Sequence, residues 1–286
     1  MMGWRDGVLA ATLAAVSAAV AAAVCGCLCA AAQELPAPAA PCGGDEIARR
    51  GVSHIIDGRT FVLDDGREVH LAAIEVPPLP QESAAAPGGA AARDALAALM
   101  AGAQAVLRRA ELKSDRYGRI VAYADAVRDD SERLAQAELL SAGFARVGDR
   151  VGSRDCAAEL LRREDAARKA KLGLWANSYY DVLHADNTAD VLAQRGRFAL
   201  VEGEVVSVRE SGATIYVNFG RRWSEDFSVT IQKRNERSFV AAGLDLKRLA
   251  GRRVRVRGWI EERGGEGGSP WIEAARPEQI EPADRK

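Results

Sequence analysis

The feature that most constrains the fold is a series of short β-type runs separated by turn residues. Residues 45–178 contain five such runs, and a helical pattern with Leu96, Leu99 and Met100 on one face stands between the third and the fourth. The runs cover residues 51–56, 60–64, 67–74, 104–112 and 119–125. Short strands at this spacing around one helix predict a small closed barrel.

Two further helices are expected after these strands. The first, "SERLAQAELLSAGF", begins with Ser131 as a candidate N-cap and ends near Gly143. The second, "SRDCAAELLRREDAARKAKLG", begins with Ser153 and carries basic residues in its last turn before Gly173, as the helix dipole favours. Together they would form a helical layer on the barrel.

Residues 179–198 are interpreted as a connector, and residues 199–282 as a second domain. A short helix is expected near 235–242, and the β-type runs cover residues 199–209, 213–219, 226–232, 252–261 and 271–276. Three strands, a helix and two strands is the order of the OB fold, a small five-stranded barrel. The predicted fold class is therefore mainly β with α (α+β), with an OB-like β-barrel as its second domain.

The first 32 residues are interpreted as a targeting segment. Arg5 precedes a long apolar run without charges, and "AAA" at 30–32 is typical of a signal-peptide cleavage site. An uncleaved membrane anchor and a lipoprotein lipidated at Cys27 remain alternatives. Residues 33–44, rich in proline, alanine and glycine, are typical of a linker. All three alternatives predict a periplasmic or extracellular location, with membrane contact only through the N-terminal segment.

The cysteines leave one question open. Removal of residues 1–32 would leave only Cys42 and Cys156 in the chain. These two thiols could pair in an oxidising compartment, or both could remain free.

The charge balance bears on the choice of partners. The net charge is −1, and acidic and basic residues are almost equally numerous in residues 43–180 and in residues 199–286. A protein that binds nucleic acid without specificity usually has a basic excess. Composition alone therefore gives no support to bulk nucleic-acid binding.

Five motifs occur in a fixed order between residues 45 and 178: "DGRT", "VHLAAIEVP", "SDRYGRIVAY", "LLSAGFARV" and "AARKAKLGLW". In these motifs the chain resembles the staphylococcal-nuclease (thermonuclease) family. The resemblance implies a five-stranded OB barrel with three helices. It also implies hydrolysis of nucleic-acid phosphodiesters with one Ca²⁺, held by carboxylates, while two arginines bind the phosphate.

Most positions that the resemblance assigns to catalysis are replaced. Arg59 stands where the family has its first metal carboxylate, and His70 stands where it has its first phosphate-binding arginine. Pro78 replaces the carboxylate that acts on the attacking water. Glu75 keeps an acid at the second metal position, and Arg119 keeps the second arginine. The resemblance therefore predicts a degenerate catalytic site.

The candidate site residues follow from these positions. Glu75 and Arg119 are the catalytic candidates if the chain is active, and Glu75 is the one weak candidate for a metal ligand. No cofactor is expected, and Ca²⁺ only if the family activity persists. Arg59, His70 and Tyr117 are candidate ligand-binding residues, because Arg59 could form a phosphate or carboxylate pocket with Arg119, and Tyr117 matches a substrate-contacting tyrosine of the family.

A second candidate surface lies in "RRVRVRGW" (252–259). Val254 and Val256 alternate there with arginines, so Arg253, Arg255 and Arg257 are predicted on one face of a strand. Such a face could bind the phosphates of an oligonucleotide. The alternative is a solvated face paired with neighbouring acids such as Glu202, Glu204 and Glu261.

The sequence thus predicts an exported binding module built on a nuclease scaffold. Its partner would be a single-stranded nucleic acid, another anionic ligand or a protein. Two other functions stay open. One is an active phosphodiesterase with a different set of carboxylates, and the other is a structural envelope protein that makes only protein contacts.

Overall fold

A computed structural model describes residues 42–80, 86–222, 224–264 and 268–283. Residues 40–286 form one compact unit. The predicted targeting segment (1–32) and most of the predicted linker (33–44) lie outside the described residues. None of the helices in the described ranges is long and apolar enough to cross a membrane.

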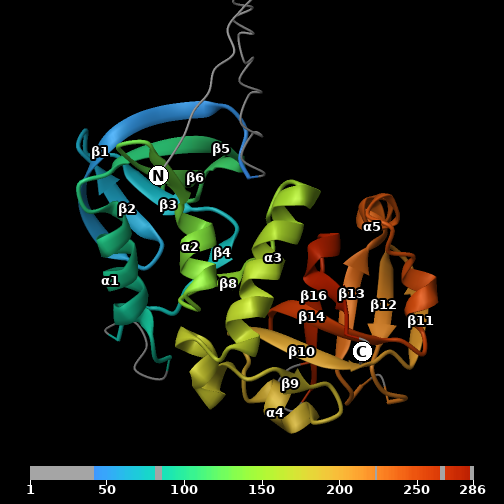
Figure 1. Cartoon of the computed structure of the whole chain (residues 1–286). Coiled ribbons are helices and arrows are strands. Elements are labelled where there is room, and N and C mark those ends of the chain that lie inside the picture. The colour runs from blue at the N-terminus through green and yellow to red at the C-terminus, as the bar shows by residue number, and fades with distance from the viewer. Residues whose placement is uncertain (1–41, 81–85, 223, 265–267, 284–286) are drawn as a thin grey trace, which may run out of the picture. The chain divides into compact units, whose positions relative to one another are not determined.

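The first group of strands closes into a barrel (Figure 1). Each strand pairs antiparallel with its neighbours, except that β3 and β6 are parallel and complete the circuit β1–β2–β3–β6–β5–β1. The strands are β1 (Glu46–Asp57), β2 (Thr60–Leu63), β3 (Glu68–Leu71), β5 (Gln104–Ser114) and β6 (Ile120–Arg128). Helix α1 (Gly89–Met100) lies between the third and fourth barrel strands in sequence. The predicted barrel is confirmed.

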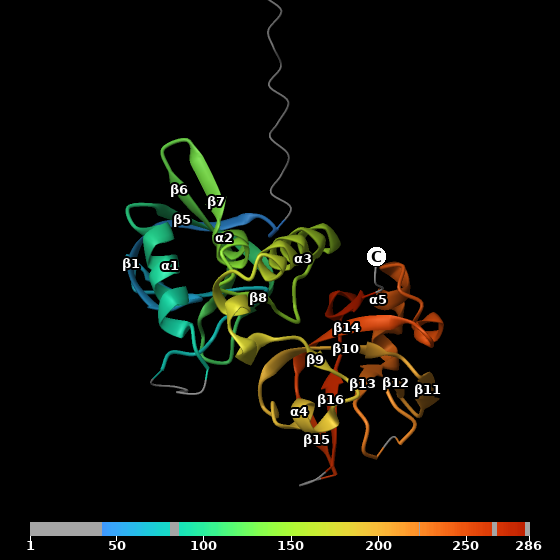
Figure 2. The same cartoon turned by 60° about the horizontal axis from the view of Figure 1, so that its bottom comes forward.

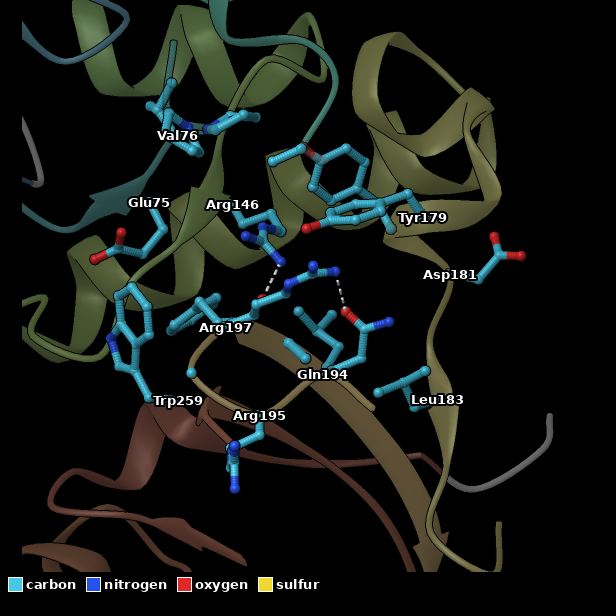
Figure 3. Close-up of a pocket in the computed structure, with 18 of the residues that line it drawn as sticks. Glu75, Val76, Arg146, Tyr179, Asp181, Leu183, Gln194, Arg195, Arg197 and Trp259 are labelled. Carbon is cyan, nitrogen blue, oxygen red and sulfur yellow. Dashed lines mark hydrogen bonds between the residues drawn. The ribbon is translucent and has the colours of Figure 1, made fainter. Parts of the chain in front are cut away.

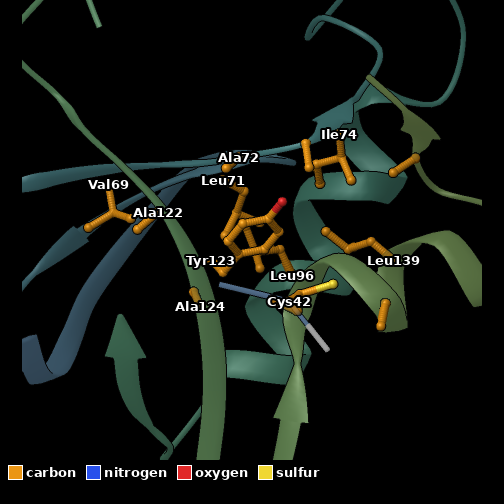
Figure 4. Close-up of a cluster of buried hydrophobic side chains, with 14 of the residues drawn as sticks. Cys42, Val69, Leu71, Ala72, Ile74, Leu96, Ala122, Tyr123, Ala124 and Leu139 are labelled. Carbon is orange, nitrogen blue, oxygen red and sulfur yellow. The ribbon is translucent and has the colours of Figure 1, made fainter. Parts of the chain in front are cut away.

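The barrel core is apolar and is closed by a disulfide. Leu96, Leu99 and Met100 of α1 are all buried, as the helical pattern predicts, and they pack with side chains from the barrel strands (Figure 4). Cys42 and Cys156 form a disulfide across 114 residues of chain, and both are fully buried in this core. The alternative of two free thiols is therefore excluded in this structure.

The first of the two predicted helices is shorter than expected. Residues Ser131–Leu134 form strand β7, which pairs with β6, and helix α2 covers only Ala135–Ser141. Figure 2 shows β6 and β7 projecting as a hairpin beyond the barrel. The prediction of Ser131 as an N-cap is therefore wrong, because the backbone of residues 131–134 satisfies its hydrogen bonds on β6 instead.

The second predicted helix, α3, covers Arg154–Lys169. Ser153 caps it as predicted, since its Oγ accepts a hydrogen bond from the amide of Cys156 at 3.2 Å. The helix ends before Gly173, which instead begins the 3₁₀ turn η1 (Gly173–Ala176). A Cβ on Gly173 would meet the carbonyl oxygen of Gly143 at 2.5 Å, so two glycines permit the close approach of these backbones.

The remaining strands form a further β domain. Its sheets are β17–β14–β10–β9 and β11–β12–β13–β16–β15, and β13 and β16 are parallel, as β3 and β6 are. The strands are β9 (Leu183–His184), β10 (Phe198–Glu204), β11 (Ser207–Ser211), β12 (Thr214–Asn218), β13 (Ser228–Gln232), β14 (Arg253–Trp259), β15 (Glu261–Arg263), β16 (Ser269–Glu273) and β17 (Ile280–Pro282). The helix between the third and fourth predicted runs is α5 (Glu236–Ala241).

Two differences from the predicted order concern the runs at 199–209 and 252–261. Each is broken into two strands, so that one piece pairs in each sheet. The predicted connector is also structured, because β9 adds a strand beside β10 and α4 covers Thr188–Leu192. The described part of the chain is thus mostly sheet with few helices, as the fold class predicts.

Candidate functional site

A cavity of about 390 Å³ lies beside strand β4 (Ile74–Glu75). Strand β8 (Arg146–Val147), which pairs with β4, also lines it, together with the connector and the start of β10 (Figure 3). Its polar lining includes Asp57, Arg59, Glu75, Arg146, Tyr179, Gln194 and Arg197. Pro78, which stands where the resemblance implies a catalytic carboxylate, also lines the cavity.

Arg59 and Glu75 form an ion pair on one wall of the cavity. The guanidinium Nη1 of Arg59 lies 2.7 Å from Oε2 of Glu75 and 3.3 Å from the carbonyl oxygen of Ile74. The turn that carries Arg59 passes very close to Val76, because a Cβ on Gly58 would meet Val76 Cγ1 at 2.5 Å. The motif "DGRT" therefore brings a cation to the acid that the sequence singles out.

This ion pair occupies the carboxylate that a metal would need. Burial raises the pKa of Glu75, and the charges of Arg59 and Arg146 oppose that rise. Asp57 also lines the cavity, but its Oδ1 accepts a hydrogen bond from the amide of Arg59 at 2.8 Å, and the side chains of Val76 and Pro78 are apolar. No group of three or more His, Cys, Asp or Glu side chains that could hold a metal ion occurs in the described ranges. The site residues therefore do not fit the Ca²⁺ that the resemblance implies.

Arg146 is the least compensated charge at the cavity. Arg146 is only 9% exposed, and its buried Nε has no hydrogen-bond partner. Nη1 donates to the carbonyl oxygen of Phe198 at 2.5 Å, and the guanidinium lies 5.2 Å from the ring centre of Tyr180. Burial lowers the pKa of Arg146, although Tyr180 and Glu75 oppose this effect.

No carboxylate comes within ion-pair distance of Arg146 in the part of the chain that the structure describes. Glu75 lies opposite it in the β4–β8 pairing, but its carboxylate is bound to Arg59. Figure 3 shows the guanidinium of Arg146 between Glu75 and Tyr179, facing the cavity. Burial without a neutralising partner is costly for a cation, so this position is suited to an anion from outside.

Arg197, which precedes β10, supplies a second cation to the lining of the cavity. Its Nη1 donates to Oε1 of Gln194 at 3.2 Å, and its guanidinium lies 4.9 Å from the ring centre of Tyr179. Neither of these partners carries a negative charge. A third arginine of the lining, Arg195, is instead bound to Glu262.

His70, Arg119 and Tyr117 form a separate cluster that does not line this cavity. Nε of Arg119 lies 2.6 Å from Oδ2 of Asp115, and its guanidinium lies 5.2 Å from the ring centre of Tyr117, which is 67% exposed. His70 Nδ1 is 3.0 Å from Oγ1 of Thr60. Burial, and then the charges of Arg59 and Arg119, lower the pKa of His70 to about 4. The histidine is therefore neutral at pH 7.

The three arginines of β14 have partners inside the protein. Glu202 binds Arg253 and Arg255 at 2.8 and 2.7 Å, so these two form the predicted paired face with one of the three acids named. Arg257 is 1% exposed and lies in a buried ion pair with Glu164 at 2.9 and 3.0 Å. Alternation placed the three arginines on one face but did not distinguish the buried position from the others.

Sequence analysis missed Arg146, Arg197 and Tyr179. Arg146 lies within the motif "LLSAGFARV", and the signal available for it was an arginine two residues after the partly buried Phe144. Arg197 and Tyr179 lie at the ends of the region interpreted as a connector. No local pattern marks them, because they meet the barrel only through tertiary packing.

Comparison with protein families identifies the part of the chain that holds the barrel. Residues 68–177 match the family model described as staphylococcal nuclease homologue. No curated protein matches the chain. The match does not reach residues 199–282, so the assignment of that part to the OB fold stays a prediction. Residues 68–177 of the chain therefore form a staphylococcal-nuclease homologue domain, and Glu75, Pro78 and Arg146 of this domain line the cavity.

Proposed function

We propose that this protein is an exported, non-hydrolysing member of the nuclease scaffold that binds a small anionic ligand in the cavity beside β4. The ligand would carry a phosphate or carboxylate group. Export rests on the N-terminal segment of the sequence, and the buried disulfide supports it, because disulfides persist in oxidising compartments.

The loss of hydrolysis follows from the charge at Arg59. A guanidinium about 5 Å from a divalent cation, at an effective dielectric constant near 20, is repelled by roughly 6–7 kcal/mol. Arg59 also holds Glu75 at 2.7 Å, so the one acid retained at the metal positions is already neutralised. Pro78 provides no group that could take a proton from water.

The observation that carries the binding proposal is the uncompensated charge of Arg146. Arg257 is also buried, but there the carboxylates of Glu164 and Glu281 outweigh the burial and raise the pKa of the guanidinium. Arg146 lacks such partners, and burial lowers its pKa. An anion in the cavity would give Arg146 the partner that Arg257 already has.

The dimensions and the lining of the cavity limit the ligand. A volume of about 390 Å³ is within the range of small-molecule sites and too small for a protein segment with its own fold. Arg197 and Tyr179 also line the cavity, and both come from the connector rather than from the barrel. An anion between Arg146 and Arg197 would accept hydrogen bonds from two guanidinium groups.

The test is ligand-dependent stability, with inorganic phosphate and a nucleoside monophosphate as probes. Both should raise the melting temperature of the full chain, because a ligand that binds only the folded state stabilises it. Arg146→Gln should abolish the rise. Arg150→Gln is the matched control, since Arg150 is exposed and four residues away. An equal rise in all three proteins would contradict binding at this cavity.

A nuclease assay tests the other half of the proposal. The full chain should not degrade single-stranded DNA with Ca²⁺ or with EDTA. The variant Arg59→Asp/His70→Arg/Pro78→Glu restores the family residues and serves as the positive control for the assay. Metal-dependent cleavage by the unmodified chain that Arg119→Ala abolishes would overturn the proposal.

A further inference from the structure

A second charged and aromatic surface lies on the five-stranded sheet β11–β12–β13–β16–β15. Ile215 and Val217 of β12 point into the core, so Tyr216 between them faces outward. Arg209 of β11 is directly opposite Tyr216 in the pairing of the two strands. Around them is an open hollow of about 680 Å³, which Arg221 and Arg263 also line.

Arg263 is held in place on two aromatic rings. Its guanidinium lies 5.5 Å from the ring centre of Tyr216 and 5.9 Å from that of Trp271. Its Nη2 is 3.4 Å from Oγ of Ser228, on the strand between them. These contacts position the charge on the sheet without neutralising it.

The hollow has more positive than negative charge. In the described ranges, Arg209, Arg221 and Arg263 have no carboxylate within ion-pair distance, whereas Glu210, the acid in the lining, is bound by Lys233 and Lys247 at 2.7 and 3.3 Å. The exposed Glu261 and Glu273 lie at the β15–β16 edge, away from Arg209 and Arg221. The positive part of the surface is therefore the β11–β12 end.

We propose that this surface binds single-stranded nucleic acid. The arginines would contact phosphates, and an unpaired base would stack on the half-buried, outward-facing ring of Tyr216 or Trp271, a combination that accommodates any base sequence. A duplex keeps its bases stacked inside and could use only the arginines. The site is distinct from the arginines of β14, which have internal partners, and from the cavity beside β4, so it goes beyond the function proposed above.

The experiment measures the fluorescence anisotropy of a labelled oligodeoxythymidylate about fifteen nucleotides long, the size of strand that such a sheet can hold. The full chain should bind it with an affinity that falls steeply between about 50 and 200 mM salt. Arg209→Gln/Arg221→Gln should weaken binding about tenfold or more at low salt. It should also reduce the slope of log affinity against log salt by about 0.7 for each phosphate that the variant can no longer bind.

Two further variants distinguish binding at this surface from a general effect of positive charge. Arg234→Gln/Arg237→Gln changes two exposed arginines near the start of α5 that do not line the hollow, and it should leave binding unchanged. Tyr216→Leu keeps an apolar side chain without a ring and should weaken binding about fivefold or more, because the base has no ring to stack on. The proposal is overturned if the full chain does not bind the strand, if both double variants weaken binding equally, or if a duplex of the same length binds as well.

Discussion

At the scale of single residues, an ion pair with Arg59 determines what Glu75 can bind. In the family pattern Glu75 would share a metal with a second carboxylate. Here that position is Arg59, and Glu75 is the acceptor of a partly buried ion pair. The guanidinium of Arg59 therefore stands where a metal cation from solution would need a second carboxylate.

Removal of the Arg59 guanidinium should show how much this ion pair contributes to the stability of the folded chain. Arg59→Met leaves a largely buried carboxylate without its closest partner and should lower the free energy of unfolding at pH 7 by about 1–3 kcal/mol. Burial raises the pKa of Glu75, so the loss should shrink as pH falls towards 4.5 and the group takes up a proton. Urea denaturation at both pH values measures it. An equal loss in a Glu75→Gln background would show that the pair itself contributes nothing.

His70 should make stability depend on pH in a defined window. Its pKa is about 4 in the folded chain and near 6.5 when unfolded, so the unfolded state binds the extra proton between these values. The free energy of unfolding should therefore fall as pH decreases from about 6.5 to 4, and His70 should have no effect above that window. His70→Gln should flatten this part of the stability curve.

The control for His70 is the exposed His54 on β1. Urea denaturation at pH 7 and pH 4.5 should give the same pH dependence for His54→Gln as for the unmodified chain. If His70→Gln retains the full loss at pH 4.5, another group is responsible for it.

At the scale of elements, the disulfide joins the segment before β1 to helix α3. It closes a span of 114 residues that contains the whole barrel. Cys42→Ala/Cys156→Ala should lower the free energy of unfolding by about 2–4 kcal/mol, chiefly because the unfolded chain gains freedom. Urea denaturation with and without reductant measures this. Reductant should destabilise the unmodified chain and leave the double variant unchanged; no difference between the two proteins would contradict a structural disulfide.

The elements show which local patterns suffice to predict a fold. Short β-type runs bounded by turn residues marked the five barrel strands, although β1 begins at Glu46 rather than at residue 51. The stretch from Ser131 to Ser141 has helical periodicity throughout, yet its first four residues pair with β6. Hydrogen bonds to a distant strand decided that boundary, and they leave no local pattern. The same reason explains why Arg146 and Arg197 were missed at the residue scale.

At the scale of the whole compact unit, one buried network joins the nuclease-homologue domain to the further β domain. Helix α3 lies between the two groups of strands in Figures 1 and 2. Glu164 of this helix is 2% exposed, and its carboxylate accepts hydrogen bonds from Nη1 and Nη2 of Arg257 on β14. Glu281 of β17 binds the same guanidinium. The buried carboxylate of the nuclease-homologue domain and the buried guanidinium of the further β domain are therefore each other's hydrogen-bond partners.

This network predicts that the two domains unfold together. Arg257→Met would leave Glu164 and Glu281 without their partner and should cost about 3–5 kcal/mol. It should also separate the domains, so that amide hydrogen exchange in β12 and β13 rises while β5 and β6 keep their protection. Arg255→Met is the matched control, because Arg255 lies on the same strand but binds the half-buried Glu202.

The control variant should lose about 1 kcal/mol or less and keep a single unfolding transition. Two separate transitions in the unmodified chain would contradict the coupling. So would an Arg257→Met variant in which β5, β6, β12 and β13 lose protection to the same extent. The cavity beside β4 is lined from both domains, so uncoupling them should also abolish the stabilisation by phosphate that Arg146 is proposed to provide.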